Sequence, residues 1–423
     1  MLIQLKKFVK SLESSLSNRG RFNYLACFFN FFGFLVGYSF FSPLTVIPLF
    51  VKHLSENTFW VGLISAISSI GFFLPQLIAA SWIQGMPFKR QYFCFVGIIE
   101  RLPILLMALS IFLFGQNNPL ILLVVTTIIF GVHTLAMGCN SPAYFDIVSK
   151  IVPTTVRGRM YGLAGALGGL FSILGAELAR LYIKSFVFPF NFSLCFATGF
   201  SVLLLTLIPM FFIYEPPSPS NQTTGLRQYL EETWVVFRTD HNFRTFICSQ
   251  VCISAFSVIV SFFTAYGRDE IGGSTSSLAR LNTVFAMGAT VGNPFWGYVA
   301  DKRGIRYMLL ICVGLTIVAT LLVMQITSIS FLYIPCMLIS FATCCFDIQS
   351  FNFTLEFANT DKMPTYTALR ASVIAPFRSM LLLISGLFID WIGYRIVFAF
   401  CLILLFIAGL LLWQVKDPRY ATG

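Results

Sequence analysis

Charged residues are scarce in this sequence. Asp, Glu, Lys and Arg make up 11% of its 423 residues, whereas a soluble domain carries about 25%. Hydrophobic residues account for 57% of the chain, and one globular core cannot hide that much apolar surface from water. A water-soluble globular protein is therefore excluded, and we expect the lipid bilayer to cover much of the folded chain.

Several motifs that carry chemistry are also missing. The sequence has no G-x-x-x-x-G-K-S/T phosphate loop, no H-E-x-x-H zinc motif and no G-x-S-x-G nucleophile motif. Its 11 cysteines have neither zinc-ligand spacing nor the pattern of a disulfide framework. We therefore expect no enzyme activity, no metal and no cofactor. The net charge of +11 does not indicate a nucleic-acid partner, because Lys and Arg mark the cytoplasmic segments of membrane proteins.

Twelve apolar stretches are each long enough to cross a bilayer, which takes about 20 residues. They predict an all-α integral membrane protein with twelve transmembrane helices in two six-helix bundles, residues 23–214 and 243–415, joined by a cytoplasmic linker, residues 215–242. A basic N-terminal segment, residues 1–22, and a tail, residues 416–423, complete the chain. The predicted spans are Tyr24–Val51, Trp60–Gln84, Tyr92–Phe114, Leu120–Pro142, Met160–Lys184, Phe190–Tyr214, Phe243–Gly267, Ser277–Ala300, Tyr307–Ile326, Ser328–Phe346, Thr365–Ile389 and Trp391–Val415.

The distribution of basic residues predicts the orientation of these spans. With both termini in the cytoplasm, 20 of the 28 Lys and Arg residues fall in cytoplasmic segments, five on the opposite side and three within spans. Such a bias favours cytoplasmic termini. The two halves are also weakly similar, because Pro153 and Pro364 each stand six residues before an arginine ahead of the fifth and eleventh spans. Duplicated halves of this kind are typical of transporter folds.

A charged block, residues 297–307, separates the eighth and ninth spans. We expect it to form a tight turn at the membrane surface, with Gly297 allowing close helix packing and Gly304 allowing the backbone to bend. The block resembles the cytoplasmic signature G-x-x-x-D-(K/R)-x-G-(K/R)-(K/R) of the major facilitator superfamily, and its matching residues are Gly297, Asp301, Lys302, Gly304 and Arg306. The stretch from Asp146 through Pro153 to Arg157-Gly158-Arg159 resembles a second segment of that family. The first-half copy of the signature, residues 84–90, lacks its aspartate.

The resemblance implies a pseudo-symmetric two-bundle fold with a central cavity. In that family the first, fourth, seventh and tenth helices line the cavity, and the second, fifth, eighth and eleventh form the moving interface. It implies a monomeric secondary transporter of a bacterial-type inner membrane that moves a small molecule by alternating access. By the symmetry of the fold, we expect Asp301 to form a conformational latch with Arg157 or Arg159 at the start of the fifth span.

Polar side chains at helical spacing mark three spans that the resemblance places at the cavity. We expect His133 and Asn140 to face Gln250 and Ser254 or Ser257 across a central space, and His133, Asp347 or Glu177 to carry a coupling proton. Packing between helices is the alternative interpretation of these polar faces. The candidates are His133, Asn140 and Tyr144 in the fourth span, Gln250, Ser254 and Ser257 in the seventh, and Asp347 in the tenth.

Ionisable residues inside other spans also need an explanation. Glu100-Arg101 lies about 15 Å into the third span, and we favour a structural ion pair there. Glu177 and Arg180 stand one turn apart in the fifth span, either as a self-contained pair or as an external gate. Arg378, deep in the eleventh span, has three candidate partners: a carboxylate, a backbone carbonyl freed by Pro376, or an anionic substrate.

Export of hydrophobic compounds is the first functional hypothesis, because the polar faces are mild and the spans are rich in aromatic residues. Uptake of a metabolite is a second. A membrane sensor or assembly partner that keeps the fold without transporting is a third, and the degraded first-half signature favours it.

Overall fold

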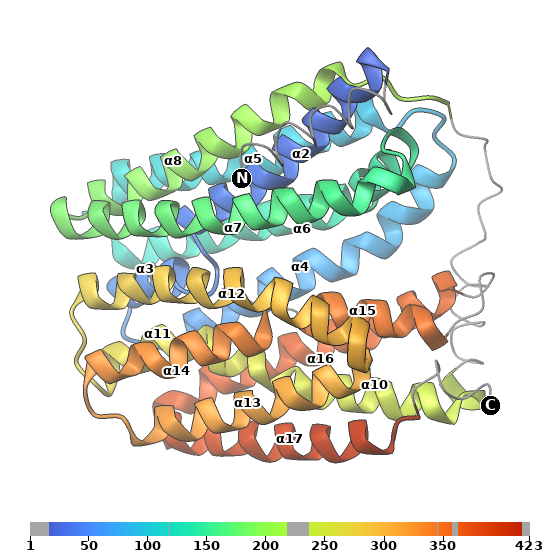
Figure 1. Ribbon diagram of the computed structural model, residues 1–423. Helices are drawn as coiled ribbons and strands as arrows, with labels where there is room; N and C mark the ends of the chain where they lie inside the picture. Colours follow the sequence, from blue (N-terminus) through green and yellow to red (C-terminus); the bar gives the residue numbers. More distant parts are fainter. Residues whose placement is uncertain (1–16, 117, 218–236, 345, 358–362, 417–423) are drawn as a thin grey trace, which may run out of the picture.

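The computed structural model describes residues 17–116, 118–217, 237–344, 346–357 and 363–416. Within these ranges the chain is helical, and no strand occurs among the described residues. Most of the predicted N-terminal segment and linker, and the tail beyond Lys416, lie outside the description. Figure 1 shows the helices in two groups, one above the other, with their axes roughly side by side.

Among the described residues the helices combine into twelve spans, six in each group, and ten of the described helices are long and apolar enough by themselves to cross a membrane. The first group contains α2 (Asn18–Phe40), α3 (Val46–Leu54), α4 (Phe59–Gln84), α5 (Arg90–Phe114), α6 (Pro119–Ile151), α7 (Thr154–Ser185), α8 (Phe190–Leu207) and the short 3-10 helix η1 (Ile208–Phe212). The second contains α10 (His241–Ile253), α11 (Ala255–Asp269), α12 (Thr275–Arg303), α13 (Ile305–Gln325), α14 (Ile329–Thr343), α15 (Phe346–Phe357), α16 (Met363–Ile392) and α17 (Tyr394–Gln414). The predicted fold class is confirmed.

Two spans are interrupted within the described residues, which the apolar pattern does not reveal. The first is split between α2 and α3, and the seventh has a one-residue irregularity at Ser254 between α10 and α11. Pro43 lies in the first break, where it lacks an N–H group and disfavours a helical Ser42. Backbone that departs from a regular helix is tolerated inside the membrane where protein or a cavity surrounds it.

The charged block of residues 297–307 is more helical than expected. Helix α12 continues to Arg303 and α13 begins at Ile305, so the turn reduces to Gly304 with a φ of 88°. Only glycine adopts this conformation readily, which confirms the predicted bend there. The expectation for Gly297 is wrong, because a Cβ atom added to it would meet nothing within 4 Å. Gly297 therefore does not provide a close helix contact in this conformation.

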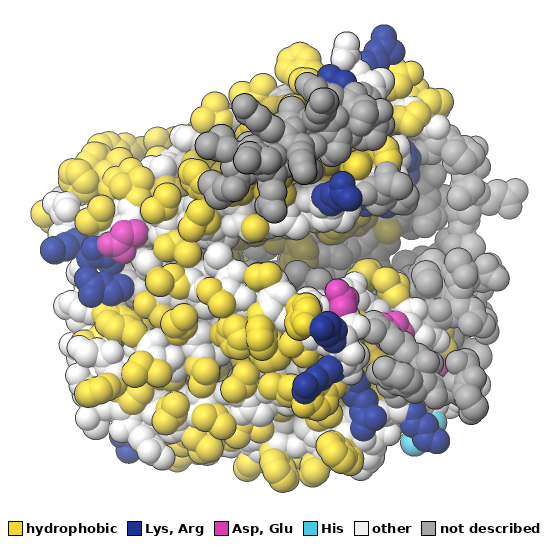
Figure 2. All heavy atoms as spheres, viewed as in Figure 1, with side chains coloured by type: hydrophobic (Ala, Val, Ile, Leu, Met, Phe, Trp, Pro, Cys, Tyr) yellow, Lys and Arg dark blue, Asp and Glu magenta, His cyan; other side chains and the backbone are white. Residues whose placement is uncertain are grey.

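Two pairs of helices join the bundles lengthwise: α4 packs against α16, and α7 against α12. We call the side where α2 begins and α17 ends the terminal side, and the opposite side the distal side. The spans run between these two sides (Figure 1). Large apolar side chains such as Leu106, Phe112 and Leu205 stand on the outer surface, and Figure 2 shows such side chains spread over the bundles. Lipid is the solvent that suits such a surface.

Candidate functional site

The distal side is closed by polar contacts that cross between the bundles. The Asn282 side chain from α12 donates to the Ser39 carbonyl oxygen at 2.7 Å, and its own carbonyl oxygen accepts from the Thr45 hydroxyl at 2.7 Å. Ser39 and Thr45 flank the break in the first span. The broken segment thus presents backbone and side-chain groups that a continuous helix would keep to itself.

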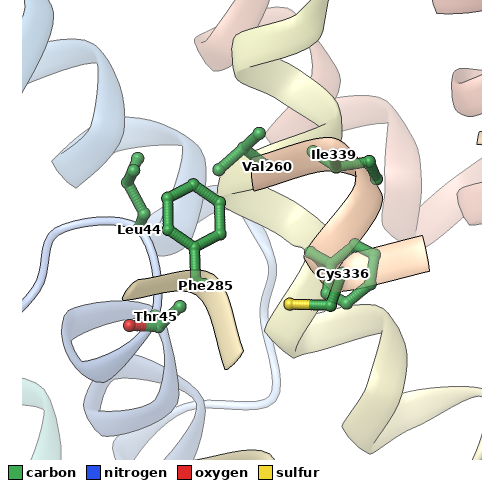
Figure 3. A pocket seen from close by; sticks show the side chains of 7 residues that line it. Leu44, Thr45, Val260, Phe285, Cys336 and Ile339 are labelled. Atoms are coloured by element: carbon green, nitrogen blue, oxygen red, sulfur yellow. The ribbon is translucent and has the colours of Figure 1, made fainter. Parts of the chain in front are cut away.

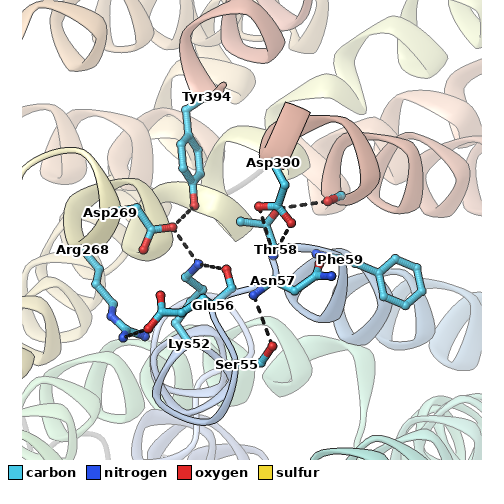
Figure 4. Close-up of polar contacts among 11 residues, drawn as sticks. Lys52, Ser55, Glu56, Asn57, Thr58, Phe59, Arg268, Asp269, Asp390 and Tyr394 are labelled. Carbon is cyan, nitrogen blue, oxygen red and sulfur yellow. Dashed lines mark hydrogen bonds and ion pairs between the residues drawn. The ribbon is translucent and has the colours of Figure 1, made fainter. Parts of the chain in front are cut away.

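A buried ion pair reinforces this closure (Figure 4). The Lys52 ammonium on α3 lies 2.7 Å from an Asp269 carboxylate oxygen at the end of α11, with 2% of the lysine side chain exposed. The same carboxylate accepts a hydrogen bond from the Tyr394 hydroxyl at 2.5 Å, and Lys52 also donates to the Glu56 carbonyl oxygen. A second pair, Arg268 with Glu56, is far more exposed.

The contact between α4 and α16 is held at the distal end by Thr58 and Asp390. The Thr58 amide and hydroxyl both donate to the Asp390 carboxylate. Farther along, Gly62 and Gly386 bring the two backbones together. A Cβ atom on Gly62 would lie 2.6 Å from the Leu382 carbonyl oxygen, so only glycine fits in this closed arrangement.

Glu177 and Arg180 form the expected ion pair one turn apart on α7. The pair also crosses between the bundles, because the Thr283 hydroxyl on α12 donates to Glu177 at 3.1 Å and Arg180 donates to the Ser276 hydroxyl at 3.5 Å. The pairing predicted from the sequence is confirmed. Because the Glu177–Arg180 pair lies between α7 and α12, it also contributes to the distal closure.

Toward the terminal side the bundles diverge. Figure 2 shows the surface hollowed between them, toward the right of the view. Behind the distal closure lies a small cavity of about 10 Å³, about the room that a single water molecule needs. Its lining comes from both bundles, and Figure 3 shows Leu44, Thr45, Val260, Phe285, Cys336 and Ile339 around it. Phe263 is the remaining lining residue. In this conformation the two bundles therefore meet at the distal side and diverge toward the terminal side, with a small cavity behind the distal closure.

His133 does not face the seventh span, so that prediction is wrong. The imidazole is fully buried inside the first bundle, with Nδ1 2.6 Å from the Glu100 carbonyl oxygen and Nε2 2.6 Å from the Tyr38 hydroxyl. Because a carbonyl only accepts, Nδ1 carries a proton, while Nε2 shares a hydrogen bond with the Tyr38 hydroxyl, which also donates to the Met137 sulfur at 2.9 Å. Asn140 is likewise turned inward, donating to the Glu100 carboxylate at 2.9 Å.

Glu100 and Arg101 form the structural pair that we favoured, 3.5 Å apart and both almost completely buried. Arg101 also donates to the Leu203 and Gly97 carbonyl oxygens. A buried pair is stable only when such extra hydrogen bonds satisfy its remaining donors and acceptors. The pair therefore joins the third, fourth and sixth spans, with His133 and Asn140 as further members of the same network.

The other predicted cavity residues are also largely withdrawn from open space. Ser254 and Ser257 hydrogen bond to carbonyl oxygens of Gln250 and Ser254 at the break in the seventh span. Tyr144 is buried and donates to the Cys27 carbonyl oxygen at 3.4 Å. Asp347 belongs to α15, but its side chain lies outside the description, so its role stays a prediction.

The predicted latch is not engaged in this conformation. Asp301 is exposed, with no hydrogen bond or ion pair to Arg157 or Arg159 among the described contacts. Arg157 instead donates to the Ser149 and Val152 carbonyl oxygens. Arg306 binds the carbonyl oxygens at the end of α17, Leu412 and Trp413, within its own bundle. Because the terminal side is open here, the latch stays a prediction about the opposite state.

Arg378 occupies the meeting point of the two bundles. Its guanidinium carbon lies 5.6 Å from the ring centre of Phe73 on α4 and 5.2 Å from that of Phe256 at the start of α11. The side chain is 8% exposed. Next to it, the Ser379 hydroxyl donates across the interface to the Ala66 carbonyl oxygen at 3.2 Å.

A charged cluster on the terminal side of the first bundle was also absent from the sequence interpretation. Asp146 pairs with Lys89 at 2.7 Å and with Lys150 at 2.6 Å. The Glu215 carboxylate accepts from Lys150 and from the backbone amides at the start of α5. Helix N-termini favour negative charge, so Glu215 fastens the end of the sixth span to the third.

Sequence reasoning missed most of the closing groups as well. Lys52, Asp269 and Asp390 stand at predicted helix ends, where charges are ordinary. Nothing in their spacing indicates which ones meet, because the partners are far apart in the chain and lie in different bundles. A sharper signal was present in the glycines of the second and eleventh spans, since Gly62 and Gly386 both sit in helices expected to form the moving interface.

Comparison with known proteins identifies the family. The sequence profile described as Major Facilitator Superfamily matches residues 29–375 and 268–423. The chain belongs to the major facilitator superfamily. An uncharacterized MFS-type transporter of Methanocaldococcus jannaschii is 26% identical over 186 residues, which span 43% of this chain and 42% of that relative. The chain is therefore a multi-pass integral membrane protein.

Solved structures of this superfamily share the fold. The D-xylose-proton symporter superposes with a TM-score of 0.73 at 12% identity, covering 94% of this chain and 98% of that one. A mutant of the nucleoside transporter NupG gives 0.71 at 11% identity, covering 93% and 98%. A bacterial homologue of the human lysosomal transporter Spinster, inward-facing and unoccupied, gives 0.67 at 14% identity, covering 97% and 100%. Sequence identities this low support a shared fold and nothing more specific.

Proposed function

We propose that this superfamily member is a secondary active transporter that moves a small molecule by alternating access. The observation that carries the proposal is the asymmetry between its two sides: polar contacts between the bundles close the distal side, and the surface is hollowed between them toward the terminal side. A membrane protein with a purely structural role does not need its two bundles to be held together on one side by polar contacts that can break. A carrier needs such contacts, because its gates have to open in turn.

The excess of basic residues supports a cytoplasmic position for the terminal side, in an inner membrane of bacterial type. On that orientation this conformation is inward-facing, like the solved structure of the bacterial Spinster homologue. We infer export of hydrophobic compounds as the direction and substrate class, because the polar faces of the cavity spans are mild and the spans are rich in aromatic residues. Uptake of a metabolite is the competing outcome of the test below.

We also propose that transport is coupled to the movement of protons. Nε2 of His133 shares a hydrogen bond with the Tyr38 hydroxyl, and in this proposal it is the nitrogen that gains and loses the coupling proton. The Glu100 carboxylate bonds to Asn140 in the same network and would stabilise a protonated imidazole. Tyr38 is only partly buried, and we propose it as the member of the network through which a proton reaches His133.

Flux through purified protein in liposomes tests the function directly. We expect an imposed proton gradient to drive uptake or release of hydrophobic dyes or organic acids, with empty liposomes as the baseline. A panel of sugars, nucleosides and amino acids tests the metabolite alternative. A non-transporting sensor predicts no flux of any compound in either direction, under any gradient, from protein that is folded by circular dichroism.

The latch gives a second test. In the state closed on the terminal side, Asp301 is expected to reach Arg157 or Arg159 near the positive N-terminus of α7. A surface contact of this kind contributes about 1 kcal/mol, yet about 1.4 kcal/mol is a tenfold change in population. Asp301→Asn should therefore lower turnover several-fold and leave the melting temperature unchanged. Equal turnover in the variant, or an equal loss in the neighbouring Lys302→Gln control, would contradict the latch.

A further inference from the structure

We propose that the terminal end of the second bundle holds an anionic phospholipid, whose phosphate binds Arg303 and Arg306 and whose acyl chains lie along α13 and α17. The inference goes beyond the proposed function and does not depend on it. Helix α12 ends at Arg303 and α13 begins at Ile305, so a single glycine separates the two helices and places both arginines at one short turn. Figure 2 shows Lys and Arg side chains gathered on this end of the second bundle.

The positive charges of this turn have no carboxylate partner. Lys302, Arg303 and Arg306 outnumber the acid of the charged block, Asp301, by three to one. Within the residues that the structure describes, none of the three cations forms an ion pair. The charged cluster on the terminal side of the first bundle differs, because it contains its own carboxylates. The turn of the second bundle is therefore the place on this side where an external anion finds free positive charge.

Aromatic rings hold the two arginines at the outer surface. The guanidinium carbon of Arg303 lies 5.5 Å from the ring centre of Tyr307, and that of Arg306 lies 6.0 Å from the ring centre of Trp413. Both rings are exposed. They belong to α13 and α17, which Figure 1 shows at the edge of the second bundle away from the first. Tyr and Trp concentrate where hydrocarbon meets head groups, so the arginines lie at the level of lipid phosphates.

Arg306 is fixed in place and still has donors for an anion. Its Nε donates to the Leu412 carbonyl oxygen at 3.1 Å, and its Nη2 donates to that of Trp413. A guanidinium carries more N–H donors than these two bonds use. Arg303 donates to the Tyr307 hydroxyl at 3.3 Å and likewise has donors left. A phosphate accepts such donors in pairs, and the two arginines therefore suit it.

The start of α13 adds to the preference for an anion. Its N-cap residue is Gly304, so no side chain caps the first turn. The helical hydrogen bonds begin with the Met308 amide, which donates to the Gly304 carbonyl oxygen at 3.3 Å. The amides before it are the unpaired donors of a helix N-terminus, which carries partial positive charge. They strengthen an anion site that the two arginine side chains define.

Apolar side chains continue from the arginines into the membrane. Val318 and Leu321 on α13, and Phe406 and Leu410 on α17, are all exposed. The two helices pack against each other, so these side chains lie on neighbouring helices at the outer edge of the bundle. A ligand that fits both parts of this surface has a phosphate at one end and hydrocarbon at the other. We therefore assign a phospholipid rather than a free phosphate ion.

Quenching of tryptophan fluorescence tests the site in the full-length protein. The reporter is Trp413; buried Trp296 is kept as a background, and the other four of the six tryptophans are replaced by phenylalanine. The bilayer contains phosphatidylglycerol or phosphatidylcholine brominated near the head group. We expect phosphatidylglycerol to bind beside Trp413 about tenfold or more tightly, because each basic residue near an anionic surface contributes about fivefold. A protein with Trp296 alone gives the background to subtract.

A second tryptophan separates a site from general attraction to the basic side of the protein. Trp82 is exposed at the terminal end of α4, in the first bundle. A protein that keeps Trp82 in place of Trp413 should prefer phosphatidylglycerol at most about twofold, because the charge of the second bundle is screened over that distance.

Variants locate the effect at the arginines. Arg303→Gln and Arg306→Gln should each lower the preference at Trp413 about fivefold. Arg303→Gln keeps the test valid if Arg306→Gln disturbs the end of α17, since Arg303 makes no bond there. Arg19→Gln is the matched control. Arg19 is an exposed cation of the first bundle, 5.1 Å from the Tyr214 ring centre, and its loss should leave the preference at Trp413 unchanged.

Equal quenching by the two lipids at Trp413, an equal preference at Trp82, or a preference that survives in both arginine variants would overturn the inference. Inorganic phosphate separates the two sources of phosphate. At the ionic strength of a sodium chloride control, it should reduce the preference no more than chloride does. A larger reduction would assign the arginines to the free ion. Flux through liposomes is read separately, because lipid binding at Trp413 without transport of any compound would remove the proposed function and leave this inference standing.

Discussion

Replacing Asp269 by alanine is expected to open the distal side. The substitution leaves the Lys52 ammonium, 2% exposed, without its carboxylate in the closed state. Breaking a buried pair from one side costs about 3–5 kcal/mol. We expect the lower end, because Asp269 is 23% exposed and Lys52 keeps its hydrogen bond to the Glu56 carbonyl oxygen. About 3 kcal/mol corresponds to a hundredfold change in the ratio of the two states.

A native cysteine reports this change. Cys336 lines the pocket behind the distal closure and is almost completely buried. In a background without the other cysteines, a membrane-impermeant maleimide should label it from the distal side far faster in Asp269→Ala. Comparing right-side-out with inside-out vesicles shows from which side the maleimide reaches Cys336, without assuming the topology.

The neighbouring surface pair supplies the control for this measurement. Glu56, which pairs with Arg268, is 79% exposed, and exposed pairs contribute about 0–1 kcal/mol. Glu56→Gln should therefore leave the labelling rate of Cys336 nearly unchanged. Equal rates in wild type and Asp269→Ala would show that the Lys52 pair does not hold the distal closure.

Replacing Gly62 by alanine is expected to have a comparable effect by a steric route. The added methyl group would lie 2.6 Å from the Leu382 carbonyl oxygen across the α4–α16 contact. Real side chains do not approach so closely, so the two helices have to separate. Overpacking of this kind costs about 1–3 kcal/mol, and the cost falls mainly on the distal-closed state. We expect transport to fall about tenfold, since about 1.4 kcal/mol is a factor of ten.

The same helix offers a matched control. A Cβ atom on Gly85, at the end of α4, would meet nothing within 4 Å, so Gly85→Ala should transport normally. The Gly62→Ala protein should also label at Cys336 from the distal side, which separates an opened gate from simple misfolding. If Gly62→Ala transports like wild type, the α4–α16 contact is not part of the cycle.

The sequence predicted those features that depend on local chemistry. Long apolar stretches have one stable solution in lipid, the helix, so the twelve spans and their division into six and six followed from composition and periodicity. The bend at Gly304 followed from glycine's freedom at positive φ, and the pairing of Glu177 with Arg180 followed from helical spacing. Each of these involves neighbours on one short segment, whose geometry is largely set by the residues of that segment alone.

Only the tertiary structure decided which faces meet. His133 and Asn140 share a helix face with the expected periodicity, yet that face packs on Glu100 in the third span rather than on the seventh. Helical spacing specifies a direction around an axis, but not which neighbour stands in that direction. The Lys52–Asp269 pair and the position of Arg378 between Phe73 and Phe256 depend in the same way on how the bundles lie against each other. Packing between segments that are far apart in the chain therefore determines the distal closure and the surroundings of Arg378.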